Sequence, residues 1–392
     1  MVRGARKYMA AMLAGLTLTL ALSIHATAEP VSSPGSLNAE AAALIDVHSG
    51  RILFSQNGDK RMKIASLTKI MTAIVAIEHG RLTDSVKAGK RAVGKEGSSI
   101  YLKLGEEMSL LHLLYGLMLR SGNDAAVAIA EHVGGSEEGF VWLMNAKAEF
   151  LGLKNTQFRN PHGLDEEGHY STANDMAKLT AYALQNPTFR EIVKTKVKTV
   201  PDPGQPWNIT WYNKNKMLTL YEGADGVKTG YTKQALRCLV SSATRNGQQL
   251  AAVTLNDPDD WTDHRKLLDF GFQNYPLHTL AREGESVRGY PYTVGRAFQY
   301  PLAEQEEGSV TAKLILNHAA RTYPFDPAGR LEFYIAGQKI GGVPVFRSDR
   351  EALQAGDDRL PGTAREAELT FTAAFMEVIE SLFRISVGTS DR

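Results

Sequence analysis

Apolar residues recur every three or four positions along residues 64–80, and Gly80 follows them as a stop signal. The spacing predicts a helix of roughly four turns that is buried on most sides and begins near Ser66. Lys69 follows Ser66 by one turn, so both side chains lie on the same side of this helix. The apolar positions are Leu67, Ile70, Met71, Ile74 and Ile77.

Alternating apolar and polar residues with turn signals predict two β-hairpins. The first spans residues 42–54 around His48-Ser49-Gly50, and the second joins residues 237–243 to 249–255 through Asn246-Gly247. These runs predict an antiparallel sheet. The remaining pattern predicts a loop with a short strand at residues 97–106 and helices at residues 110–119, 124–132, 137–153, 171–185 and 260–270.

The chain changes character after Pro276. Residues 284–346 contain short β-like runs and a hairpin at residues 331–346, which predict a small all-β domain after a larger first domain. A polar stretch follows, and residues 363–386 predict an amphipathic helix with Phe375, Ile379 and other apolar residues on one face.

The N-terminus has the layout of a secretory signal peptide. Arg3, Arg6 and Lys7 precede an apolar stretch, and Ala26-Thr27-Ala28 provides the small residues of a cleavage site. We therefore expect residues 1–28 to be removed during export, with an uncleaved anchor as the alternative.

Composition limits the partners and the redox chemistry. The 392 residues carry a net charge of +1, which gives no reason to expect nucleic acid as a partner. Cys238 is the only cysteine, so the exported chain has no intrachain disulfide. Because Cys238 lies within an apolar run, we expect it to be a packed core residue rather than a reactive thiol.

Two histidines raise the question of a metal site. His162 and His169 lie in a loop region, and no helix between them gives the spacing of metal ligands. We interpret both as structural and expect no metal or organic cofactor.

Three short motifs combine polar side chains in a pattern that suits nucleophilic catalysis. Ser66 and Lys69 form S-x-x-K, and Ser121 and Asn123 form S-x-N in a tight turn between helices. Residues 228–230 form K-T-G, and we expect them to lie on or beside an edge strand of the antiparallel sheet, because they precede the second hairpin. Each motif alone is weak, because turn chemistry and helix packing explain it equally well. Burial would lower the pKa of Lys69, and a neutral lysine can take a proton from a serine.

Together, in this order and after a signal peptide, the motifs are specific. Over residues 38–275 the chain resembles the serine-type D-Ala-D-Ala carboxypeptidases, the low-molecular-weight penicillin-binding proteins. The resemblance implies an α/β (α+β) domain of the penicillin-recognising serine transpeptidase and β-lactamase type, with helices flanking an antiparallel sheet. It also implies that the all-β domain is followed by a helix attached to the outer face of the cytoplasmic membrane. Further matching segments are residues 97–99, 151–156, 161–165 and 225–232.

The resemblance implies a substrate, peptidoglycan pentapeptide stems, and an inhibitor class, the β-lactam antibiotics. Ser66 would be the acyl-ester nucleophile, Lys69 its base, Ser121 the proton donor to the leaving D-alanine, and Asn123 a contact to the peptide amide. The backbone N–H groups of Ser66 and Tyr231 would form the oxyanion hole. Lys228 would also be catalytic, because its positive charge would favour the anionic end of the substrate and lower the pKa of Lys69. The substrate-binding residues would be Lys228, Thr229, Gly230 and Tyr231.

Two positions depart from the family pattern. Leu236 follows Ala235 where the family often has glycine, and we expect its side chain to crowd the neighbouring strand. Where the family can place an arginine before its last catalytic-domain helix, this chain has residues 259–261, Asp-Asp-Trp, with Arg265 slightly displaced. We therefore assign the substrate's carboxylate to Thr229.

Two alternatives stay open. A class A β-lactamase shares the serine and both lysines, but no E-x-x-L-N pattern for a deacylating glutamate lies between Asn123 and Lys228. A non-catalytic wall-binding protein on the same fold is the second alternative, and the Leu236 departure keeps it under consideration.

Overall fold

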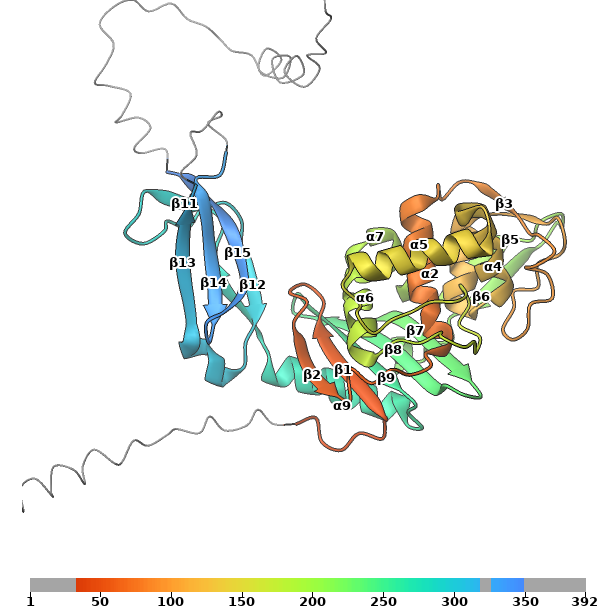
Figure 1. Ribbon diagram of the computed structural model, residues 1–392, viewed down its shortest axis with the longest axis horizontal. Helices are drawn as coiled ribbons and strands as arrows, with labels where there is room; N and C mark the ends of the chain where they lie inside the picture. Colours follow the sequence, from red (N-terminus) through yellow and green to blue (C-terminus); the bar gives the residue numbers. More distant parts are fainter. Residues whose placement is uncertain (1–32, 318–325, 349–392) are drawn as a thin grey trace, which may run out of the picture.

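The computed structural model describes residues 33–317 and 326–348, and a five-stranded antiparallel sheet lies at the centre of its larger part (Figure 1). The strand order is β2-β1-β9-β8-β7, so β7 and β2 are its edges. The predicted signal peptide at 1–28 and helix at 363–386 lie outside the described residues. The strands are β1 Ala41–Asp46, β2 Ile52–Gln56, β7 Ala224–Thr232, β8 Leu236–Arg245 and β9 Gln248–Leu255.

Both faces of the sheet are covered, which explains why β1 is buried along its whole length. Successive side chains of a strand point to opposite faces. Ala43 and Ile45 accordingly join the core beneath the helical layer, while Ala42 and Leu44 pack with the helix α9 on the other side. Figure 1 shows α9 on one side of the sheet and α2, α5 and α6 on the other.

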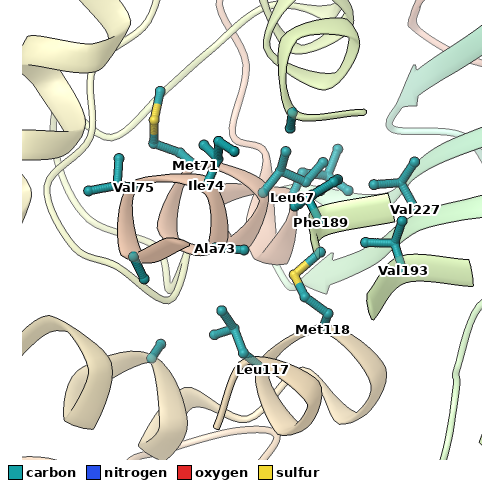
Figure 2. Packing of buried hydrophobic residues seen from close by; sticks show 14 of the residues in the cluster. Leu67, Met71, Ala73, Ile74, Val75, Leu117, Met118, Phe189, Val193 and Val227 are labelled. Carbon is teal, nitrogen blue, oxygen red and sulfur yellow. The ribbon is translucent and has the colours of Figure 1, made fainter. Parts of the chain in front are cut away.

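The predicted helices are present, with shifted ends. The Ser66 helix begins as a single 3₁₀ turn and continues as α2 to His79, with Gly80 after it as expected. Figure 2 shows apolar side chains around α2, which explains its burial. The bounds are η1 Ala65–Thr68, α2 Lys69–His79, α3 Leu110–Tyr115, η2 Gly116–Arg120 (a π-helix), α4 Asn123–Gly134, α5 Glu137–Phe150, α6 Ala173–Gln185, α7 Pro187–Lys194, α8 Met217–Leu220 and α9 Asp260–Asn274.

The expected short strand within residues 97–106 is wrong. The strand in this region, β4 at Glu107–Ser109, begins after that range and pairs with β3 at Ser85–Lys87. Residues 97–106 instead form loops and turns. A carboxylate of α4 binds two of their backbone N–H groups, so a strand ladder is not needed to satisfy these two.

Residues 197–222 contain a hairpin and a short helix. The hairpin consists of β5 Val197–Pro201 and β6 Asn208–Tyr212. Arg120 at the end of η2 donates to the carbonyl of Tyr212, which attaches this hairpin beside the S-x-N turn. Lys214 follows the hairpin, and its backbone N–H donates to the carbonyl of Leu119 in η2 at 3.2 Å.

An all-β part follows α9. The strand β10, which lies before residue 284, pairs with β12, and a four-stranded sheet has the order β11-β15-β14-β13. Arg51 of the larger part pairs with Glu306 at 2.5 Å and donates to the carbonyl of Pro301, joining the two parts. The strands are β10 Leu277–Ala281, β11 Tyr292–Val294, β12 Phe298–Pro301, β13 Val310–Leu316, β14 Gly329–Ile335 and β15 Gln338–Arg347, with a 3₁₀ turn η3 at Glu304–Ser309.

The expectation that Leu236 crowds its neighbouring strand is wrong. Leu236 is the first residue of β8, and its backbone adopts a left-handed conformation with φ of 57°. Its side chain is 42% exposed, so it points to solvent instead of the sheet. The departure therefore costs backbone strain rather than a steric clash.

Within residues 33–317 and 326–348, no helix has the length and apolar character needed to cross a membrane.

Candidate active site

Ser66 lies in the 3₁₀ turn before α2, and two glycines allow other segments to approach this turn closely. Ala65 has a φ of 46°, and a Cβ on Gly163 would lie 2.0 Å from the Ala65 carbonyl oxygen. A Cβ on Gly230 of β7 would lie 3.2 Å from the backbone nitrogen of Ser66. The glycine of K-T-G therefore lets the edge strand pass directly beside the serine.

Lys69 points back over Ser66 from the first position of α2. Its Nζ lies 3.1 Å from Ser66 Oγ, 2.6 Å from Asn123 Oδ1 and 2.6 Å from the carbonyl oxygen of His162. The side chain is completely buried, and its interactions come from α4 and from the loop before α6. The position of the Lys69 amine therefore depends on three segments that are distant from one another in sequence: its own helix, α4 and the loop that carries His162.

The two lysines of the motifs have strongly lowered pKa values. For Lys69, burial is the main cause and the charges of Lys228 and Lys214 add to it, while Asp124 acts in the opposite direction; the pKa lies well below its usual range. For Lys228, burial and then the charge of Lys214 lower the pKa to about 7. The site can therefore hold a neutral Lys69 beside a Lys228 that is partly charged at neutral pH.

Ser121 is placed by a break between two helices. The π-helix η2 ends at Ser121, which has the left-handed φ of 65°, and α4 begins two residues later at Asn123. Asn123 donates from its backbone to the Ser98 carbonyl at 2.7 Å and from Nδ2 to the Glu96 carbonyl at 2.6 Å. Backbone strain of this kind persists only where the surroundings hold it, and here the loop before residue 100 does so.

Asp124 holds the loop that borders the site, a role that its place in the S-x-N segment did not suggest. Its carboxylate accepts from the backbone N–H groups of Ile100 and Leu102 and from the hydroxyl of Ser99 at 2.6 Å. A buried carboxylate needs such donors to offset its lost hydration. The Gly97-Ser98-Ser99 segment is thereby fixed against the S-x-N turn.

The K-T-G residues lie on the edge strand β7, as predicted. Lys228 is buried, and its Nζ donates to the Thr229 carbonyl at 2.8 Å. Thr232 at the end of β7 donates to Asp165 at 2.9 Å, which ties the strand to the loop that carries His162. Thr232 therefore anchors the strand two residues beyond Gly230, where the strand passes Ser66.

A cavity of about 370 Å³ opens over these elements. Ser66, Ser121 and Thr229 all line it, whereas Lys69, Asn123 and Lys228 lie buried behind its wall. The structure thus brings the three motifs together around one cavity, with hydroxyl groups in front and amines behind. The other lining residues are Ser98, Lys214, Gly230, Tyr231, Arg237, Cys238, Asp260 and Trp261.

Two cationic residues of this cavity were missed from the sequence. Lys214 lies on one wall, and its Nζ is 3.0 Å from Ser98 Oγ. Arg237 lies on another wall and pairs with Asp260 at 2.5 Å. Pairing the strand of Lys228 with the strand that follows it could have placed Arg237 opposite Tyr231. No local sequence pattern pointed to Lys214. The displaced Arg265 is exposed and does not line the cavity.

The remaining candidate groups are structural, as expected. Cys238 is 1% exposed, and burial raises the pKa of its thiol to about 12. His169 Nε2 lies 2.8 Å from Thr68 Oγ1, and burial lowers its pKa to about 3, so this ring is neutral. His162 contributes its backbone carbonyl to Lys69. Across residues 33–317 and 326–348, no group of three or more His, Cys, Asp or Glu side chains is arranged to hold a metal ion.

The fold and the cavity define a class of protein. A serine with a buried lysine one turn later, a second serine at a helix break and a lysine on the neighbouring edge strand are the motif set of the serine penicillin-binding enzymes. Residues 26–259 match the family Peptidase S11, D-alanyl-D-alanine carboxypeptidase. The chain belongs to this family, which confirms the expected serine D-Ala-D-Ala carboxypeptidase activity and the role in the cell wall.

Known relatives match this chain over most of their length. D-alanyl-D-alanine carboxypeptidase DacF of Bacillus subtilis is 38% identical over 285 residues, which cover 70% of this chain and 72% of the relative. DacC of Escherichia coli is 34% identical over 350 residues, covering 82% and 86%. The crystal structure of penicillin binding protein 5 from Haemophilus influenzae has a TM-score of 0.66 at 29% identity and covers 81% of this chain and 98% of that one. The expected fold class is confirmed for the catalytic and all-β parts.

Proposed function

We propose that the chain removes the terminal D-alanine of peptidoglycan stem peptides through an acyl-enzyme on Ser66. The contacts of Lys69 carry this proposal. A neutral amine has two N–H donors and one lone pair, and Lys69 has two carbonyl acceptors, from Asn123 and His162. Its lone pair is then directed to the Ser66 hydroxyl 3.1 Å away. Lys69 takes that proton as Ser66 Oγ attacks the carbonyl carbon of the penultimate D-alanine.

The tetrahedral oxyanion is stabilised by the backbone N–H groups of Ser66 and Tyr231. The close passage of Gly230 beside the Ser66 nitrogen supports this pairing, because it brings β7 to the serine. Preorganised N–H donors in a site of low water content stabilise developing charge more strongly than water does, and losing one typically costs about a hundredfold in rate.

The leaving group needs a proton, and Ser121 passes on the one that Lys69 took from Ser66: its hydroxyl gives a proton to the departing D-alanine nitrogen and receives the lysine's proton in return, which leaves Lys69 neutral again. Ser121 lines the cavity, while Lys228 lies behind it with its pKa lowered to about 7. Asn123 holds Lys69 through Oδ1, and the second lone pair of that oxygen accepts an N–H of the peptide. Gly230 keeps the strand close enough for the peptide to lie along it.

The terminal carboxylate of the substrate lies near Thr229, whose side chain lines the cavity. Lys228 and Lys214 give this region a positive potential that favours an anion. After D-alanine leaves, water hydrolyses the ester on Ser66. β-Lactams acylate the same serine because their strained amide resembles the acyl-D-Ala-D-Ala group.

Release of D-alanine from diacetyl-Lys-D-Ala-D-Ala, measured with and without prior treatment with penicillin, tests this function. We expect release that penicillin blocks through a long-lived penicilloyl-enzyme. A folded protein that releases no D-alanine supports the non-catalytic wall-binding alternative. Fast turnover of penicillin supports the β-lactamase alternative.

We further propose that the protein is exported and held on the outer face of the cytoplasmic membrane. The signal-peptide pattern of residues 1–28 supports export, and the amphipathic pattern of residues 363–386 supports attachment. Deletion of residues 363–392 should move the protein from the membrane fraction to the soluble fraction. Unchanged fractionation would contradict attachment through this segment.

A further inference from the structure

Arg237 lies on the same face of the sheet as the threonine of K-T-G. In the β7–β8 ladder Tyr231 is opposite Arg237, and Thr229 is opposite Leu239. Residues directly opposite share a face, as do residues two apart on a strand, so Thr229, Tyr231 and Arg237 point to one side. Thr229 and Arg237 are diagonal neighbours, a separation that a long side chain spans. Both line the cavity that contains Ser66.

Asp260 holds one edge of this guanidinium and leaves the rest free. Arg237 Nη2 donates to Asp260 Oδ1 at 2.5 Å, and Asp260 is almost completely buried at the first position of α9. The guanidinium carbon also lies 5.8 Å from the centre of the Trp261 ring. The Arg237 side chain is nevertheless 44% exposed. A guanidinium has five N–H donors, so a group fixed by one carboxylate can still bind a second one.

We propose that Arg237 binds the terminal carboxylate of the substrate together with Thr229, and that Asp260 is the residue that positions it. The inference rests on the proposed function. It also accounts for the missing arginine before α9. In this chain the carboxylate, Asp260, lies at the start of α9, and the guanidinium, Arg237, lies on β8. The positive charge therefore reaches the cavity from the strand rather than from the helix.

Lys214 is the other cation of the cavity that could bind the substrate's carboxylate, and its position distinguishes it from Arg237. Lys214 lies beside Ser98, on the wall formed by the loop that Asp124 holds. It does not share the face of Thr229, and its ammonium is a compact charge without the planar fork that matches a carboxylate. Lys214 therefore contributes potential, while Arg237 and Thr229 make the directional contacts.

The test compares diacetyl-Lys-D-Ala-D-Ala with the same peptide carrying a terminal carboxamide. Mass spectrometry measures the release of D-alanine and D-alaninamide. Arg237→Leu should lower kcat/KM for the free acid by about tenfold to a hundredfold, as expected for loss of a hydrogen bond between charged groups, and change the carboxamide rate by less than about twofold. Arg237→Lys should retain part of the preference for the free acid. An Arg237→Leu variant with an unchanged acid-to-amide ratio overturns the proposal.

Arg245 supplies a matched control, because it lies at the other end of β8 and pairs with Asp269 of the same helix at 3.5 Å. Arg245→Leu loses a similar strand-to-helix ion pair but should leave the acid-to-amide ratio unchanged. An equal fall of the ratio in Arg245→Leu and Arg237→Leu would indicate a structural effect and contradict the proposal. Thermal melting monitors folding in each variant.

Exchange of the two charges tests the positioning role of Asp260. Asp260→Asn should lower the ratio less than Arg237→Leu does. The double variant Arg237→Asp with Asp260→Arg should recover more of the ratio than Arg237→Asp alone, because the cation is then supplied from the helix. No recovery in a folded double variant contradicts the role assigned to the pair. Wild-type protein that releases no D-alanine contradicts the proposed function instead, so the two failures are distinguishable.

Discussion

Lys69 Nζ lies 3.1 Å from Ser66 Oγ, and every other hydrogen-bond partner found for this amine is a carbonyl oxygen. No carboxylate contacts it directly among the described residues, so burial and two cationic neighbours dominate its titration. The pair therefore combines a serine that needs a base with a lysine that has lost its usual preference for the charged form.

Ser66→Ala should abolish labelling by fluorescent penicillin while leaving the fold intact, because it removes the only atom that forms the ester. Ser286→Ala is a suitable control, since Ser286 is exposed in the all-β part. Labelling is measured by gel fluorescence and intact mass. Full labelling of the Ser66→Ala protein would contradict the assignment of the nucleophile.

Lys69→Met should keep the buried volume close to that of the wild type and remove the base. We expect acylation by penicillin at pH 7 to fall by about a hundredfold or more, in line with the loss of general-base catalysis. Lys90→Met, at an exposed position, is the control. Stopped acylation with an intact thermal transition supports the role of Lys69, whereas a normal acylation rate excludes it.

Lys214→Met should move the pH profile of acylation to higher pH. The positive charge of Lys214 lowers the pKa of both Lys69 and Lys228, so its removal raises both values. Lys69 must be neutral to accept the proton. The midpoint of the acidic limb should therefore move to higher pH by about half a unit at low salt, and by less at high salt. The alkaline limb, where Lys228 loses its charge, should move in the same direction. Lys216→Met is the control.

A shift of the Lys214→Met profile to lower pH would contradict this electrostatic account. An equal shift in Lys216→Met would attribute the effect to general surface charge. The measurement is the second-order rate of penicillin acylation between pH 5 and pH 10.

Leu236→Gly should stabilise the protein by roughly 0.5–1 kcal/mol, because glycine adopts the left-handed conformation without the cost that leucine carries. The exposed leucine side chain contributes little burial that would be lost. For a protein of this size the gain corresponds to a rise in Tm of about 1–3 °C. Leu220→Gly, at a similarly exposed leucine in α8 that has no left-handed φ, should lower Tm. A lower Tm for Leu236→Gly would contradict the strain argument.

Local signals predicted much of the framework. Ser109 and Thr172 accept from backbone N–H groups at the starts of α3 and α6, so both helix starts could be recognised from nearby residues. The Asn246-Gly247 turn placed β8 and β9 correctly for the same reason. These features depend on interactions between residues a few positions apart, and the sequence contains that information directly.

The all-β part was predicted less completely. Its hairpin at β14 and β15 was recognised, whereas β10 and β12 were missed because they pair across the intervening residues without a shared tight turn. Long-range pairing of short strands leaves little local pattern.

The sequence by itself determined the family, the edge-strand position of Lys228 and the pairing of Ser66 with Lys69, because one helical turn separates the last two. Only the tertiary structure decided that Lys214 and Arg237 enter the same cavity. Their positions follow from the packing of a hairpin against η2 and of α9 against β8. The periodicity of apolar residues along the chain does not tell which distant segments pack together. The positions of these two cations in the cavity are therefore known only from the tertiary structure.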